Sequence, residues 1–136
     1  MRMEDFVSPK EIDKKGTLKT IVIFSHNLDF SYSLFMFFQD KYEVTLTTNK
    51  ELLIDLVRSS EIDLLIADTS PSEKVEELFR SIKQYSSNLP IILLYVYRIE
   101  SQRLEKNIKK YVDAVFYKPI DLEEVTRRIN ELVMRG

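Results

Sequence analysis

Five short segments of strand composition alternate with five segments of helical spacing along this chain, and few folds accommodate such a pattern. Four of them are mainly apolar and rich in β-branched or aromatic residues, which predicts strands at residues 21–24, 63–68, 90–96 and 114–117. The fifth, at residues 42–47, alternates between apolar and polar residues, which predicts a strand at an edge of the sheet. In the intervening segments apolar residues recur three and four positions apart, which predicts helices at 28–40, 49–59, 70–82, 101–110 and 121–133. The chain is therefore predicted to contain five β–α units.

Most of the predicted strands are apolar at every position, as in residues 21–24 and 90–94. Strands that are buried on both faces have this composition, and they occur in parallel sheets covered by helices on each side. Right-handed crossovers then leave few topologies, of which we predict the flavodoxin-like, doubly wound α/β fold with strand order 2-1-3-4-5. In that order a site is expected beyond the carboxyl ends of strands one and three, near Ser25, His26, Asn27 and Asp68.

Two of the predicted helices begin with capping patterns. Ser70-Pro71-Ser72-Glu73 has a serine before a proline and a glutamate three residues after that serine. We therefore predict Ser70 as the N-cap and Pro71 as the first helical residue. Asp121-Leu122-Glu123-Glu124 has the same spacing and opens the last helix.

The length of 136 residues fits one domain. Residues 1–19 are polar and charged, with Pro9 and Gly16 as breakers, so we expect a flexible N-terminal extension followed by one domain at 20–136. The first 20 residues lack the apolar core of a secretory signal, and no apolar run approaches the roughly 20 residues of a membrane helix. We expect a cytoplasmic protein without membrane contact.

Composition excludes several kinds of function. The net charge of −2 provides no strong attraction to nucleic acid, so we expect no nucleic-acid partner. The chain has no cysteine, which excludes disulfides and thiolate metal sites. Its two glycines cannot form a glycine-rich phosphate loop. Because no pair of nucleophile and base is visible either, we do not expect an enzyme.

Three segments resemble the response-regulator receiver (CheY-like) family over residues 19–136. Residues 63–68 are similar to the third strand of that family, with Asp68 at the phosphoacceptor position. Residues 90–94 are similar to the fourth strand, and Lys118-Pro119 is similar to the pair that follows the fifth. The resemblance implies a module of two-component signal transduction or phosphorelay, with Lys118 at the phosphate-binding position.

The chain departs from the family pattern at most other site positions. Ser25 and His26, followed by Asn27, occupy the place of the acidic pair that holds Mg²⁺ in the family. Tyr95 stands at the position of the switch threonine or serine, and Val115 at that of the switch aromatic residue. These departures imply a degenerate member, a pseudo-receiver, with no metal or other cofactor. Mg²⁺ is expected only under the alternative of a working receiver.

The residues that remain from the family pattern are expected to have a structural role. Asp68 and Lys118 should face each other across the site, so we predict a direct salt bridge between them. Asp68 is alternatively a strand-end carboxylate that accepts nearby N–H groups. A single histidine such as His26 is most often an ordinary loop residue, and Tyr95 and Val115 are most simply core residues.

The first predicted helix has more apolar side chains than one buried face can hold, including Phe37 and Phe38. Either the N-terminal extension covers some of them through Phe6 and Val7, or they form an interface with a partner or a second copy. Tyr97 leads into the face formed by the fourth helix, the fifth strand and the fifth helix. Receiver domains commonly use that face for dimers and partners, so Tyr97 is a further interface candidate.

We therefore expect a protein-interaction module that functions without phosphorylation of Asp68. Its partner would be a protein, either a histidine kinase or a downstream signalling protein, and a homodimer is a further alternative. Two other functions stay open. One is a working response regulator phosphorylated at Asp68, and the other is a flavodoxin-like domain that binds a small ligand.

Overall fold

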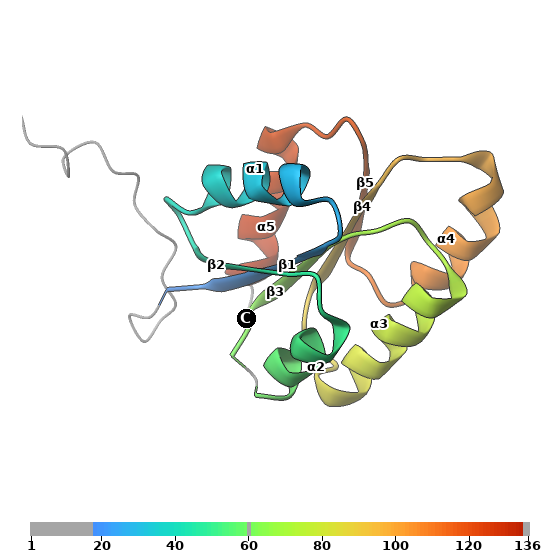
Figure 1. The fold of residues 1–136 in the computed structure, drawn as a ribbon, viewed down its shortest axis with the longest axis horizontal. Helices are drawn as coiled ribbons and strands as arrows, with labels where there is room; N and C mark the ends of the chain where they lie inside the picture. The colour runs from blue at the N-terminus through green and yellow to red at the C-terminus, as the bar shows by residue number, and fades with distance from the viewer. Residues whose placement is uncertain (1–17, 60, 135–136) are drawn as a thin grey trace, which may run out of the picture.

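The computed structural model describes residues 18–59 and 61–134, and these residues form a five-stranded parallel sheet between two layers of helices (Figure 1). The strand order is β2-β1-β3-β4-β5, as the alternating pattern predicts. The strands are β1 (Thr20–Ser25), β2 (Glu43–Thr47), β3 (Leu64–Asp68), β4 (Ile91–Tyr95) and β5 (Ala114–Tyr117). The α-helices are α1 (Leu28–Phe38), α2 (Lys50–Arg58), α3 (Glu73–Tyr85), α4 (Gln102–Ile108) and α5 (Leu122–Val133).

Side chains of the central strands point alternately to two separate cores. Val22, Leu65 and Leu93 face the side covered by α2, α3 and α4, where Phe79 is fully buried. Ile23, Ile66 and Leu94 face the side covered by α1 and α5. Burial on both faces explains why the central strands are apolar at every position. β2 lies at an edge of the sheet, and its residues alternate between exposed and more buried positions.

The strand register brings the predicted site residues to one edge of the sheet. Ser25 pairs with Asp68 across β1 and β3, and Asp68 pairs with Leu94 across β3 and β4. Tyr95 pairs with Tyr117 across β4 and β5. Because the strands are parallel, the loops that follow them meet at this same edge.

The start of α3 differs from the sequence prediction. The N-cap is Ser72, whose hydroxyl accepts a hydrogen bond from the Val75 N–H at 3.1 Å, and the helix begins at Glu73. The prediction of Ser70 as the cap is wrong, because Pro71 lies before the helix rather than in its first turn. The Asp121 cap is confirmed, since its carboxylate accepts from the Glu123 and Glu124 N–H groups.

Two expectations concern the N-terminus and membranes. The predicted extension at residues 1–19, with Phe6 and Val7, lies outside the described residues except for its last two positions. Among the residues that the structure describes, no helix is long and apolar enough to cross a membrane.

Candidate functional site

A cavity of about 410 Å³ lies where the carboxyl ends of β1, β3, β4 and β5 meet. Its walls come from the ends of these strands and from the loops that follow them. The lining residues are His26, Asn27, Asp68, Thr69, Ser70, Tyr95, Val96, Arg98 and Lys118. The cavity thus contains several of the side chains that the sequence assigns to a site, from segments far apart in the chain.

Asp68 is buried, and each of its carboxylate oxygens has a partner inside the protein. Oδ1 lies 2.7 Å from Nζ of Lys118, so the predicted salt bridge is confirmed. Oδ2 accepts a hydrogen bond of 2.7 Å from the hydroxyl of Ser25. The Asp68 side chain is 5% exposed and that of Lys118 is 20% exposed, so water screens this pair only weakly.

Two contacts fix the position of Lys118. Its backbone N–H donates to the Tyr95 carbonyl at 2.9 Å, which extends the pairing of β4 and β5 by one residue. Its ammonium lies 3.8 Å from the centroid of the Phe30 ring, a close cation–π contact. Phe30 belongs to the first turn of α1, so Lys118 links that helix to Asp68.

Ser25 and His26, at the position of the acidic pair, and the following Asn27 make contacts unrelated to metal binding. Ser25 is buried, and its hydroxyl also accepts from the Asn27 N–H at 3.0 Å. Asn27 is the N-cap of α1, with its side-chain oxygen accepting from Phe30 N–H at 3.1 Å. His26 is exposed and contacts the Phe24 ring edge to face at 5.5 Å between centroids.

The site does not fit a divalent cation. Mg²⁺ is bound in proteins mainly by carboxylate oxygens, and Asp68 is the single acidic side chain that lines the cavity. Within residues 18–59 and 61–134 no group of three His, Cys, Asp or Glu side chains is arranged to hold a metal ion. The neutral Ser25 and Asn27 give a weak ligand set.

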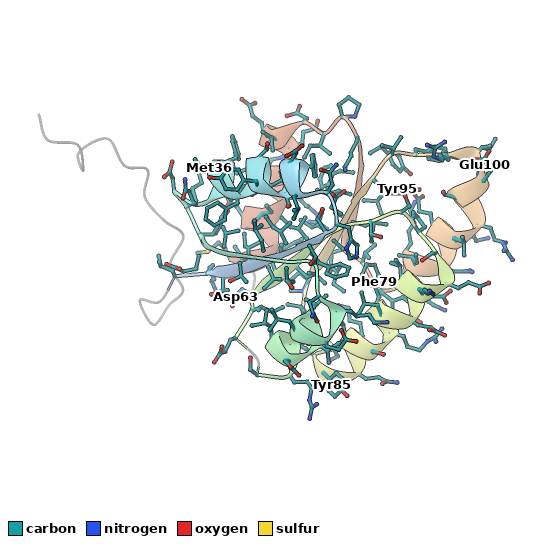
Figure 2. The ribbon with its side chains drawn as sticks, viewed as in Figure 1. Met36, Asp63, Phe79, Tyr85, Tyr95 and Glu100 are labelled. Atoms are coloured by element: carbon teal, nitrogen blue, oxygen red, sulfur yellow. The ribbon has the colours of Figure 1, made fainter. Side chains whose placement is uncertain are left out.

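Tyr95 lies at the end of β4, between the sheet and α4 (Figure 2). A polar cluster beside the cavity holds its hydroxyl. Its hydroxyl donates to Oε1 of Glu105 at 2.6 Å, and the hydroxyl of Tyr117 donates to the same oxygen at 2.7 Å. Lys109 approaches the other carboxylate oxygen of Glu105 at 3.5 Å. One buried carboxylate therefore joins β4, α4 and β5.

The pKa values of this cluster follow from its contacts. Burial tends to raise the pKa of Glu105, but the hydrogen bonds from Tyr95 and Tyr117, together with nearby Lys109, lower it on balance. Burial and the bond to Glu105 raise the pKa of Tyr95. The hydrogen bond to Glu105 and burial raise the pKa of Tyr117 to about 12. At neutral pH the cluster consists of one carboxylate and two neutral phenols.

Known structures share this arrangement of strands and helices. A two-component response regulator from Clostridium difficile is 21% identical with a TM-score of 0.72, and the match covers 86% of this chain and 97% of that one. An N-terminal signal receiver domain of a response regulator from Bacteroides fragilis is 16% identical with a TM-score of 0.74, covering 88% and 100%. This chain has the fold of a receiver domain.

A third similar structure belongs to the redox sensors of streptococci, a family that evolved from two-component response regulators. It is 16% identical with a TM-score of 0.73, and the match covers 85% of this chain but 51% of that one. The chain thus spans about half of that protein. No protein-family model and no curated protein matches the sequence.

The interface candidates differ in how the receiver fold places them. Phe37 is 42% exposed and Tyr97 is also exposed, so both are available to a partner. Phe38 has no exposed surface and packs against Tyr42, so the interface prediction fails for this residue. The reason is helical spacing, which turns Leu34 and Phe38 to the core and leaves Tyr32 and Met36 outside.

Two residues of the site were not identified from the sequence. Glu105 lies among charged residues, and such a stretch suggests a solvated helix face. Glu105 lies three residues before Ile108, so both side chains are on the buried face of α4. This spacing is the signal that could have identified Glu105. Phe30 is one of several aromatic residues of α1, and nothing in the sequence connects it to Lys118, 88 positions later. Val115, predicted at a switch position, is half-buried against the core beside α2, α3 and α4.

Proposed function

We propose that this chain is a protein-interaction module with the receiver fold, which binds its partner without phosphorylation of Asp68 and catalyses no reaction of its own. The observation that carries this proposal is the state of Asp68. Both of its oxygens are bound within the protein, to Lys118 and Ser25. Phosphoryl transfer also needs a cation that neutralises the incoming charge, and the cation beside Asp68 is the ammonium of Lys118.

The surroundings of Asp68 support the same proposal. Phosphoryl transfer relies on electrostatic stabilisation, largely from divalent metal. Among residues 18–59 and 61–134, Lys118 is the one positive group that forms an ion pair with Asp68, and its charge is already balanced by that carboxylate. The neutral Ser25 cannot replace the missing acidic ligand.

The cluster around Glu105 supports a fixed binding surface rather than a switched one. A switch requires a residue that moves between two positions of similar free energy. Tyr95 is buried and hydrogen-bonded to Glu105, so moving it outward would leave that carboxylate with one phenol fewer. The structure of α4 and β5 is therefore the same, in this proposal, whether or not Asp68 is modified.

The working receiver is the second candidate, and one observation favours it. Asp68 and Lys118 adjoin a cavity of about 410 Å³ that a phosphoryl group could enter. In that case Lys118 would shift from Asp68 to a phosphoryl oxygen. A protein partner, such as a histidine kinase or a downstream signalling protein, belongs to both proposals.

An amide NMR titration distinguishes the two. We would add Mg²⁺ and then beryllofluoride, an aspartyl-phosphate mimic, to the wild-type chain and to Asp68→Ala as the control. We expect no Asp68-dependent shifts. Shifts that begin at Asp68 and Lys118, extend to residues 95–117 and disappear in Asp68→Ala would establish the working receiver and refute the fixed module.

A further inference from the structure

A groove of about 330 Å³ lies between α2 and α3, which pack side by side on one face of the sheet (Figure 1). The residues that line the groove all differ from those that line the candidate site. Leu78 is buried and Ile54 is half-buried, so these two side chains form an apolar floor. Tyr85, at the end of α3, is 52% exposed and lines the same groove (Figure 2).

The rim of this groove is acidic. Glu51 and Asp55 lie on successive turns of α2, and Glu77 lies on α3. Lys50 is their basic neighbour in the lining. In the part of the chain that the structure describes, none of the three carboxylates forms an ion pair or a hydrogen bond. The groove therefore has a net negative charge that no contact of its own carboxylates balances.

Two arginines of the same helices are held by other partners. The Arg58 guanidinium lies over the Tyr85 ring, 5.2 Å from its centroid, and Arg80 donates to Glu76 at 3.3 Å. Neither arginine forms an ion pair with a described carboxylate of the groove. The contact of Arg58 also shows that the Tyr85 ring accepts a guanidinium. The groove carboxylates are thus available to cations that another molecule supplies.

The arrangement of the carboxylates indicates which kind of cation fits. Within residues 18–59 and 61–134, no group of three acidic or histidine side chains converges on a point where a metal ion could bind. The groove carboxylates come from two helices, so several separate cationic groups match them better than one ion does. Lysine and arginine suit the floor as well, because their aliphatic stems cover apolar surface while the charged ends stay at the rim.

The groove also continues beyond the space that one side chain fills. A second cavity of about 510 Å³ adjoins it, and Lys50, Glu51 and Leu78 line both. A channel of this kind accommodates a length of peptide, as when a helix of one protein lies in a groove of another. The second cavity extends to His26 and Thr69, which also line the candidate site, so only the part between α2 and α3 is separate from that site.

We infer that the groove between α2 and α3 binds a basic segment of a partner protein. The lysine and arginine stems of the segment would cover Ile54, Leu78 and Tyr85, and their charged ends would pair with the carboxylates of the rim. The inference rests on the proposed function, because it names a surface and a class of partner for the same module.

Charge argues against other occupants of the groove. A two-fold contact places a patch against itself, so the three carboxylates would meet the same residues of a second copy. Juxtaposed like charges disfavour such a complex. The phosphates of a nucleic acid would meet the same repulsion. A basic segment is instead attracted by each carboxylate.

The test is a selection of random displayed peptides on the immobilised full chain, followed by fluorescence anisotropy with an enriched peptide. We expect enriched peptides that contain at least two lysine or arginine residues. Their affinity should fall as the salt concentration rises, because salt screens the exposed carboxylates of the rim. A parallel selection on Glu77→Lys should not enrich the same peptides.

Charge reversal in the groove is compared with the same reversal elsewhere. Asp55→Lys and Glu77→Lys should each weaken binding about fivefold or more, and Glu77→Gln should weaken it less. The matched control is Glu131→Lys, which makes the same change in net charge on α5, against the other face of the sheet, and should leave the affinity unchanged. Tyr85→Ala should weaken binding, whereas Tyr32→Ala, at a position 58% exposed on α1, should not.

Four outcomes would overturn the inference. They are no enrichment, enrichment of neutral or acidic peptides, the same affinity in Glu77→Lys as in Glu131→Lys, and equally tight binding of spermidine, which would assign the groove to small polycations. Sedimentation that shows a dimer abolished by Tyr85→Ala would assign the groove to a second copy instead. Circular dichroism verifies that each variant folds, and if a charge reversal prevents folding, Glu77→Gln and Tyr85→Ala decide the test.

Repeating the anisotropy with Mg²⁺ and beryllofluoride separates this inference from the proposed function. An Asp68-dependent change in affinity would refute only the phosphorylation-independent function. A failure to bind basic peptides, with no Asp68-dependent shifts in the NMR titration, would refute only the role of the groove.

Discussion

At the scale of single residues, the charge on Asp68 is stable in a buried position because of two neighbours. Lys118 supplies the opposite charge and Ser25 a hydrogen bond. Removing one partner from a buried pair leaves the other charge without compensation, which costs more free energy than the intact pair contributes. The stability of the chain should therefore depend on Lys118.

The first prediction concerns that dependence. We expect Lys118→Met, which keeps an aliphatic chain over Phe30, to lower the free energy of unfolding by about 2 kcal/mol, less than for a fully buried pair because Lys118 is partly exposed. Urea denaturation measures the change. In a double-mutant cycle with Asp68→Asn the loss should shrink, since the neutral amide no longer needs a cation. If Lys118→Met lowers the free energy of unfolding by the same amount in the Asp68→Asn background, packing rather than charge is responsible.

The second prediction is a pH dependence set by Glu105 and its two phenols. The pKa of Glu105 is lowered in the folded state, so its contribution to stability is present above its ordinary pKa and is lost as pH falls through the folded value. The pKa of Tyr117 is raised from 10.0 to about 12, so its contribution is complete below 10.0 and is lost as pH rises toward 12.

Ultraviolet absorbance of tyrosinate checks this second prediction directly. Tyr95 and Tyr117, two of the seven tyrosines, should ionise above pH 10.0, the ordinary pKa of a tyrosine. In Glu105→Gln the pKa of Tyr117 should fall toward 10.0, because the carboxylate that disfavours the phenolate is gone. An unchanged titration in Glu105→Gln would mean that the hydrogen bonds to Glu105 do not determine these pKa values.

At the scale of elements, α1 shows how one helix can have a buried and an unusually apolar exposed face. Leu34 and Phe38 are buried, while Leu28, Tyr32, Met36 and Phe37 are exposed. The sequence predicted that not all of these residues could be buried, and this is confirmed. The sequence could not indicate which residues are buried, because eight of the eleven helix positions are apolar or aromatic and the usual contrast between faces is weak.

The third prediction uses two adjacent aromatic residues of α1. Phe38→Ala should lower the free energy of unfolding by about 3–5 kcal/mol, because it leaves a cavity beneath the helix. Phe37→Ala, one position away and 42% exposed, should cost less than about 1.5 kcal/mol. Chemical denaturation of both variants tests the assignment of faces. Similar losses in the two variants would contradict it.

At the scale of the whole molecule, the fold was predictable because its signal is repeated. Five strands that alternate with five helices all indicate one architecture, and an error at one end of one element, such as the cap of α3, does not alter it. The pairing of Asp68 with Lys118 was also predictable, since both residues follow strands that end at one edge of the sheet.

The rest of the site depends on contacts that have no repeated pattern. The bond from Ser25 to Asp68 requires the register of β1 and β3, and the position of Glu105 beneath Tyr95 requires the docking of α4. Each of these contacts joins residues from separate elements through a single side chain. Propensity and spacing describe elements one at a time, so they do not reveal which polar groups meet when the elements pack.

The last prediction is that the thermal stability of the whole domain does not respond to Mg²⁺. A ligand that binds only the folded state raises Tm, by about 5 °C for this size at roughly ten times its Kd. With a single carboxylate in the cavity, wild-type Tm should stay constant at millimolar Mg²⁺. The double variant Ser25→Asp, His26→Asp should gain a Mg²⁺-dependent rise, because three carboxylates then surround one point. The carboxylate introduced by Ser25→Asp is buried and can prevent folding. In that case the single variant His26→Asp, at an exposed position, should show a smaller Mg²⁺-dependent rise in Tm. A Mg²⁺-dependent Tm in the wild-type chain would show that Ser25 and Asn27 suffice as ligands beside Asp68, and the argument from the missing acidic pair would then fail.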